Sequence, residues 1–219
     1  MMQRFGWMTT CLVLGGLLGC YAQPSMRGAP VVSTPSLVTR AGNPNDFLKI
    51  HAVALLPIEY ESRLRLVSDD LRARAERDLV SAFEREVDLR IVPADEVRKR
   101  VPEMGQRDLG ALGNRLGVDG VVVTTVHQFV EREGTAIGSE RPATVDFSMR
   151  LVRSGSGEEI WRATYHVKDE ALSDNLLALG ERLGSGSVAQ FRGAQAMLAT
   201  GFASAGRDLA EARQLTFQR

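Results

Sequence analysis

The sequence predicts an α/β (or α+β) fold built on a mixed sheet of about five strands. In the first half, compact β-branched runs alternate with amphipathic stretches, which is the order of a β-α-β-α-β unit with partly parallel strands. The second half holds two alternating segments joined by a turn sequence, which is typical of an antiparallel hairpin. Two further helices at the end of the chain are expected to pack on the sheet.

The first half is predicted from apolar runs and helical spacing. Leu71, Ala75, Leu79 and Phe83 recur every four residues among charged residues, as on one face of a helix. Gly117 is placed to end another helix in a left-handed conformation. The expected elements are a strand at 51–57, a helix at 69–86, a strand at 89–93, one or two helical turns at 95–100, a helix at 108–116 and a strand at 120–126.

The second half is predicted from strict alternation. Val145, Phe147, Met149 and Leu151 share one face of a strand, and Ser154-Gly-Ser-Gly157 supplies the turn. The last predicted helix is rich in Ala and Gly, which would permit close approach to the sheet. The expected elements are a polar loop at 131–142, strands at 144–152 and 160–167, and helices at 172–183 and 188–212.

The beginning of the chain has the pattern of a lipoprotein signal. Arg4 precedes an apolar run that ends in Leu17-Leu18-Gly19-Cys20, a lipobox. We expect residues 1–19 to be a signal peptide and Cys20 to carry the acyl chains, with ordinary signal cleavage near Tyr21-Ala22 as the alternative. The apolar run is much shorter than the ~20 residues of a membrane-spanning helix.

Residues 20–46 contain four prolines among Ser, Thr, Gly and Asn. Proline removes backbone donors and keeps the preceding residue extended. We expect a lipidated, Pro-rich tether or an extension along a sheet edge, the former being favoured. Residues 47–219 are then expected to form a single globular domain.

Composition restricts the classes of function. The chain has 27 basic and 27 acidic residues, so no positive excess favours nucleic-acid binding. Its cysteines are Cys11 and Cys20, and the first would leave with the signal peptide. We therefore expect no disulfide and no metal ligated by cysteine, and no motif indicates a metal or another cofactor.

The residues suited to catalysis are few. Histidine occurs at His51, His127 and His166, each in or beside a predicted strand. The last two could approach Asp146 or Ser148 on an adjacent strand and form a Ser/His/Asp set. Neither a Gly-x-Ser-x-Gly elbow nor a zinc-protease motif is present. The sequence therefore predicts a protein that is not an enzyme.

The order of elements resembles a group of bacterial envelope proteins. A lipobox and a tether precede "HAVALLPIE", "LRIVPADEV", "LGVDGVVVTTV" and "GEEIWRATY", and the resemblance covers roughly residues 49–167. The group includes the lipoproteins CsgG, PelC and LpoB and the amino-terminal domain of TolB. It implies a mixed α/β domain that faces the periplasm and acts by contact with other envelope proteins, sometimes as a ring. The short polar loop at 131–142 lacks the long strands of a pore, and residues 171–219 do not match the group.

We therefore expect a lipid-anchored accessory or assembly protein of the export, polysaccharide or peptidoglycan machinery. Its partner would be another envelope protein, with a homo-oligomer as a further expectation and the lipid anchor as its only membrane contact. Tyr21 stands where aspartate commonly signals inner-membrane retention, so we expect the outer membrane, facing the periplasm. A small-ligand or glycan-binding protein, with its site at the carboxyl ends of the parallel strands, is one alternative. A hydrolase using His127, Asp146 and a serine is the other.

Overall fold

The computed structural model describes residues 35–64, 67–102, 108–134, 139–169 and 193–217. The predicted signal peptide, Cys20 and the predicted helix at 172–183 lie outside the described residues. The statements below concern the described ranges alone.

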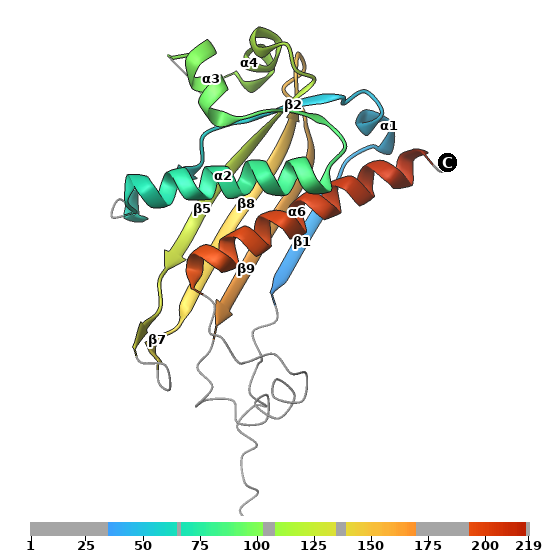
Figure 1. The fold of residues 1–219 in the computed structure, drawn as a ribbon. Helices are drawn as coiled ribbons and strands as arrows, with labels where there is room; N and C mark the ends of the chain where they lie inside the picture. Colours follow the sequence, from blue (N-terminus) through green and yellow to red (C-terminus); the bar gives the residue numbers. More distant parts are fainter. Residues whose placement is uncertain (1–34, 65–66, 103–107, 135–138, 170–192, 218–219) are drawn as a thin grey trace, which may run out of the picture. The chain divides into compact units, whose positions relative to one another are not determined.

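A seven-stranded mixed sheet forms the centre of the fold, in the order β1-β9-β8-β5-β2-β4, with β3 also pairing with β5 (Figure 1). The pairs β5-β2, β2-β4 and β3-β5 are parallel, and the remaining pairs are antiparallel. The strands are β1 (Ser36–Ala41), β2 (Ala52–Leu55), β3 (Glu59–Tyr60), β4 (Arg90–Val92), β5 (Gly120–Val130), β8 (Ala143–Arg153) and β9 (Glu159–Asp169). A separate two-stranded pair consists of β6 (Glu133–Gly134) and β7 (Ser139–Arg141).

The helices cover the two faces of the sheet unequally. Figure 1 shows α2 and α6 crossing one face, whereas α3 and α4 lie at the end of the sheet near β2. The helices are α1 (Pro44–Phe47), η1 (Ser62–Leu64), α2 (Asp69–Glu86), α3 (Ala94–Arg100), α4 (Leu109–Leu116) and α6 (Ala194–Phe217). No helix in the described ranges is both long and apolar enough to cross a bilayer.

Two apolar clusters follow from this arrangement. The larger lies under α2 and α6 and takes the inward side chains of β8 and β9, among them Phe147, Trp161 and Tyr165. The smaller joins α3 and α4 to the opposite face of β2, β4 and the start of β5, through residues such as Ala54, Leu112 and Val121. β2 is buried along its whole length because it is covered on both faces.

The end of the chain is held on the sheet by close packing and by one carboxylate. A Cβ atom added at Gly201 of α6 would lie 2.6 Å from Phe147 and 2.8 Å from Tyr165. Further along α6, Asp208 accepts hydrogen bonds from Trp161 Nε1 at 2.8 Å and from Thr39 Oγ1 at 2.9 Å. The helix therefore approaches the sheet closely, as the Ala and Gly content predicts.

The predicted α/β fold and its order of elements are confirmed. The helix at 69–86 has the predicted bounds, and Gly117 has a φ of 64° at the end of α4. Ser154–Gly157 forms the hairpin turn, with positive φ at Gly155 and Gly157.

Three expected boundaries are wrong. The folded part begins at or before residue 36, because β1 pairs with β9 and Asn43 caps α1 within the segment for which a tether was favoured. For residues 36–41 the alternative expectation, an extension along a sheet edge, is the one that the structure shows. Part of the expected loop at 131–142 forms β6 and β7. The last helix runs from 194 to 217, later than the predicted 188–212. All five predicted strands are present, as β2, β4, β5, β8 and β9, and β1 and β3 bring the sheet to seven strands.

Candidate functional site

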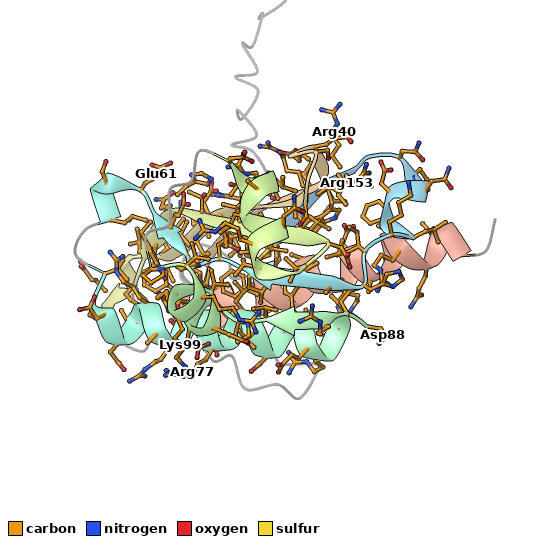
Figure 2. All side chains as sticks on the ribbon, turned by 90° about the horizontal axis from the view of Figure 1, so that it is seen from above. Arg40, Glu61, Arg77, Asp88, Lys99 and Arg153 are labelled. Atoms are coloured by element: carbon orange, nitrogen blue, oxygen red, sulfur yellow. The ribbon has the colours of Figure 1, made fainter. Side chains whose placement is uncertain are left out.

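One part of the sheet has a surface that no described helix covers. Side chains alternate along a strand. In β1, β9, β8 and the second half of β5, one set of side chains therefore points into the core, and the other set points outward. Figure 2 shows Arg40 and Glu61 on the side of the sheet away from Arg77 of α2. We call this surface the polar face; its outward residues are Ser36, Val38, Arg40, Thr125, His127, Gln128, Asp146, Ser148, Arg150, Arg162, Thr164 and His166.

The strand register orders the polar face into three rows. The first row consists of Arg40, Arg162 and Arg150, which are register partners across β1, β9 and β8. The second consists of Val38, Thr164, Ser148 and Thr125, and the third of Ser36, His166, Asp146 and Gln128. The face thus presents cations, hydroxyl groups and a His-carboxylate pair in parallel lines.

Ser148, His127 and Glu61 form a hydrogen-bonded set on this face. His127 Nε2 lies 2.8 Å from Ser148 Oγ, and His127 Nδ1 lies 2.6 Å from Glu61 Oε1. A register shift in β5 between Val126 and Gln128 accompanies this placement: Val126 enters the core while His127 turns outward. Such bulges commonly re-aim a side chain.

The order serine, imidazole, carboxylate is that of a nucleophilic triad, but its surroundings differ from a hydrolase site. Ser148 lies in the middle of β8, whose neighbours β5 and β9 are hydrogen-bonded on both sides. Its backbone N–H and those of adjacent residues belong to these ladders, so they are not free to stabilise an oxyanion. The described backbone around Ser148 therefore offers no free N–H group of the kind that forms an oxyanion hole.

The predicted catalytic residues are only partly brought together. His127 approaches Ser148 as expected, but its carboxylate partner is Glu61, while Asp146 lies 3.3 Å from His166 Nδ1. His51 is elsewhere, and its backbone N–H donates to Asp119 at 2.9 Å. Glu61 was missed because it follows β3, a two-residue strand without a recognisable pattern.

The arginine row has one strong counter-ion. Glu159 accepts from Arg162 Nε at 2.7 Å and from Nη2 at 2.6 Å. The pKa of Glu159 is lowered chiefly by this hydrogen bonding, with further contributions from the charges of Arg162, Arg150 and Arg40. The charges of Arg40 and Arg150 both act on Glu159, and that of Arg150 also acts on Glu59. Like charges opposite each other in a sheet are destabilising, so this row has a cost to the fold.

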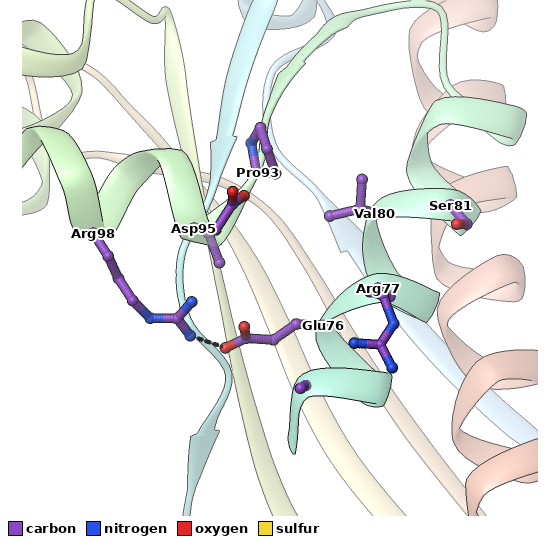
Figure 3. A pocket seen from close by; sticks show the side chains of 9 residues that line it. Glu76, Arg77, Val80, Ser81, Pro93, Asp95 and Arg98 are labelled. Carbon is purple, nitrogen blue, oxygen red and sulfur yellow. Dashed lines mark hydrogen bonds and ion pairs between the residues drawn. The ribbon is translucent and has the colours of Figure 1, made fainter. Parts of the chain in front are cut away.

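A groove of about 530 Å³ lies between α2 and the start of α3, beside Pro93 at the end of β4 (Figure 3). Its floor includes Val80 and Pro93, and its rim includes Arg77 and the ion pair of Arg98 with Glu76. The hydrogen bond that Arg98 Nη2 donates to the Glu76 carboxylate raises the pKa of Arg98. Because Pro93 follows β4, the groove lies where a carboxyl-end ligand site is predicted.

No group of three or more His, Cys, Asp or Glu side chains within the described ranges is arranged to hold a metal ion. The expected lack of a metal or other cofactor stays a prediction.

Comparisons with known proteins identify no family. The sequence matches no protein-family model, and it matches no curated protein. Similar solved structures include bacterial lipoproteins. A PelC dodecamer from Paraburkholderia phytofirmans is 13% identical, with a TM-score of 0.47 over 81% of this chain and 98% of that one. Lipoprotein GNA1162 from Neisseria meningitidis is 20% identical, with a TM-score of 0.43 over 62% of this chain and 93% of that one. Both TM-scores are below 0.5, so these likenesses carry no conclusion about function. The narrower grouping with CsgG, LpoB and TolB stays a prediction.

Proposed function

We propose that this protein is a lipid-anchored binding protein of the bacterial envelope, which acts by contact through the polar face and not by catalysis. The predicted lipobox at Cys20 supports the location. The expected site is the periplasmic side of the outer membrane, and the expected partner is another envelope protein.

The observation that carries the binding function is the composition of the polar face. Its outward residues are polar or charged apart from Val38, and they are arranged in register on the sheet. The aromatic residues of β8 and β9 point into the core. A flat face without aromatic side chains is poorly suited to stacking on sugar rings, whereas ordered donors and charges suit a protein surface.

The test is recovery of partners from envelopes crosslinked in living cells, using tagged full-length protein. Thr164→Arg places a long charged side chain at the centre of the polar face without entering the core, since Thr164 is exposed. Arg74→Glu on the exposed side of α2 is the matched control, as Arg74 pairs only with its helix neighbour Asp70 in the described residues. We expect the control to retain the wild-type set of crosslinked proteins and Thr164→Arg to lose it. Identical recovery by both variants would argue against the polar face as the binding surface.

The groove between α2 and α3 supports a second candidate function, the binding of a small ligand. Its apolar floor and the guanidinium of Arg77 suit a molecule with an apolar body and an anionic group. A thermal-shift screen of such molecules, compared between wild type and Val80→Asp, tests this alternative. A stabilising molecule that acts equally on both proteins would place its site elsewhere.

A further inference from the structure

The two edge strands of the sheet, β4 and β1, differ in how well they are protected against pairing with a further strand. At one end, β4 has three residues and is followed by Pro93, which limits pairing with another strand. At the other end, β1 has six residues and contains no proline. Within the described ranges, nothing pairs with its outer edge. β1 thus has the features of an edge that accepts another strand.

The side chains of β1 add a second observation. Leu37 and Thr39 face the core and α6, whereas Val38 faces outward and is 68% exposed. Val38 is the one apolar residue in a polar row with Thr164 and Ser148. Burial of an exposed valine stabilises a contact, and a β-branched residue packs well against a neighbour across two strands.

We propose that β1 pairs antiparallel with β1 of a second copy of this chain, with Val38 opposite Val38. Residues directly opposite in such a pair lie on the same face of the sheet. The twofold axis must therefore pass through a residue and not between two residues, because otherwise a core-facing side chain would meet an outward-facing one. This leaves few registers for so short a strand.

Charge selects among these registers. An axis at Arg40 would bring two guanidinium groups together, and an axis at Thr39 would place Val38 opposite Arg40. An axis at Val38 pairs the two valines and sets Arg40 opposite Ser36 of the second copy. The arginine row of each copy would then continue into the row of Ser36, His166, Asp146 and Gln128 of the other, which contains the carboxylate of Asp146. Like-charged rows are thereby kept apart.

The contact is small. A strand pair of this length buries much less than the ~1,600 Å² of a typical stable interface. Association is therefore expected to be weak in dilute solution and stronger where copies are concentrated on a surface. The inference goes beyond the proposed function, since contact between copies is independent of binding to a different protein.

Cysteine trapping in the full-length protein tests both the contact and its register. Val38→Cys should form a disulfide-linked dimer under mild oxidation, because opposite Cβ atoms in a strand pair lie within reach of a disulfide. Thr164→Cys, on the same face but one strand further in, is the matched control. The wild type, treated in parallel, reports any dimer due to Cys11 or Cys20. We expect roughly tenfold more dimer from Val38→Cys than from the control.

A mixture of two variants then measures the register. Ser36→Cys and Arg40→Cys should each give little dimer alone and a crosslinked heterodimer when combined. Equal trapping of Val38→Cys and Thr164→Cys would overturn the proposal, because it would indicate random collision. A mixture that gives no more dimer than its separate components would also overturn it. If a segment of the same chain covered the β1 edge, Val38→Cys and Thr164→Cys would likewise be trapped equally.

Discussion

The most informative prediction on the fold concerns Asp208, which connects the last helix to the first strand. Its carboxylate accepts from Trp161 Nε1 at 2.8 Å and from Thr39 Oγ1 at 2.9 Å. Trp161 is only 1% exposed, so water cannot replace the carboxylate as acceptor if it is removed. Asp208→Ala would leave a buried indole N–H without a partner, which is a costly state.

The magnitude follows from these two bonds. Hydrogen bonds to a charged group contribute about 1.5–3 kcal/mol each. Removing the carboxylate also relieves its own desolvation, so we expect a loss near the lower end of their sum, about 3 kcal/mol in the free energy of unfolding. Thr39→Ala removes one bond and is expected to cost about 1.5 kcal/mol. Because both changes remove the same Thr39–Asp208 contact, their combination should cost less than the sum of the two.

Urea unfolding followed by circular dichroism measures these losses. Glu211→Ala, an exposed position on the same helix, is the control and should change stability by less than about 0.5 kcal/mol. If Asp208→Ala were no more destabilising than this control, the carboxylate would not hold α6 on the sheet. Additive losses for Asp208 and Thr39 would likewise contradict their direct contact.

The remaining predictions concern packing, pH dependence, chemistry and location. Gly201→Ala should destabilise by about 1–3 kcal/mol in urea unfolding, because its Cβ meets two buried rings, whereas Gly206→Ala should be neutral or stabilising. The pKa of Glu159 is lowered in the folded state, so its contribution to stability is present above the ordinary carboxyl pKa and is lost as pH falls through the lowered value. Glu159→Gln should therefore flatten the acid side of a curve of unfolding free energy against pH. An unchanged curve would contradict this. A fluorophosphonate probe should label wild type no more than Ser148→Ala, since the backbone N–H groups around Ser148 are engaged in the sheet ladders; labelling that depends on Ser148 would support the hydrolase alternative. Cys20→Ser should move the protein from the membrane pellet to the soluble fraction, and continued pelleting would contradict lipid anchoring.

The sequence predicted those parts of the fold that have a strong local pattern. The four-residue spacing of Leu71, Ala75, Leu79 and Phe83 specifies a helix regardless of its neighbours. The β1 strand has no such pattern: its Leu37 is partly buried only because α6 and β9 arrive from more than 120 residues away. Proline on either side of β1 suggested a tether, but pairing with β9 makes this segment a strand.

The candidate site was less predictable for the same reason. The alternation of β8 and β9 already indicated that Asp146, Ser148 and Arg150 share an outward face. The joining of Ser148 to His127 and Glu61 depends on a bulge in β5 and on a two-residue strand, which are set by pairing and not by local composition. The arginine row likewise requires the register of three strands.

In-cell photocrosslinking tests whether the protein works by contact through the polar face. A photoreactive amino acid is placed at Thr164 on this face and, in a second strain, at Arg74 on the exposed side of α2. We expect discrete adducts with an envelope protein when the probe replaces Thr164, and none of these adducts when it replaces Arg74. The same adducts from both positions, or from position 74 alone, would contradict it.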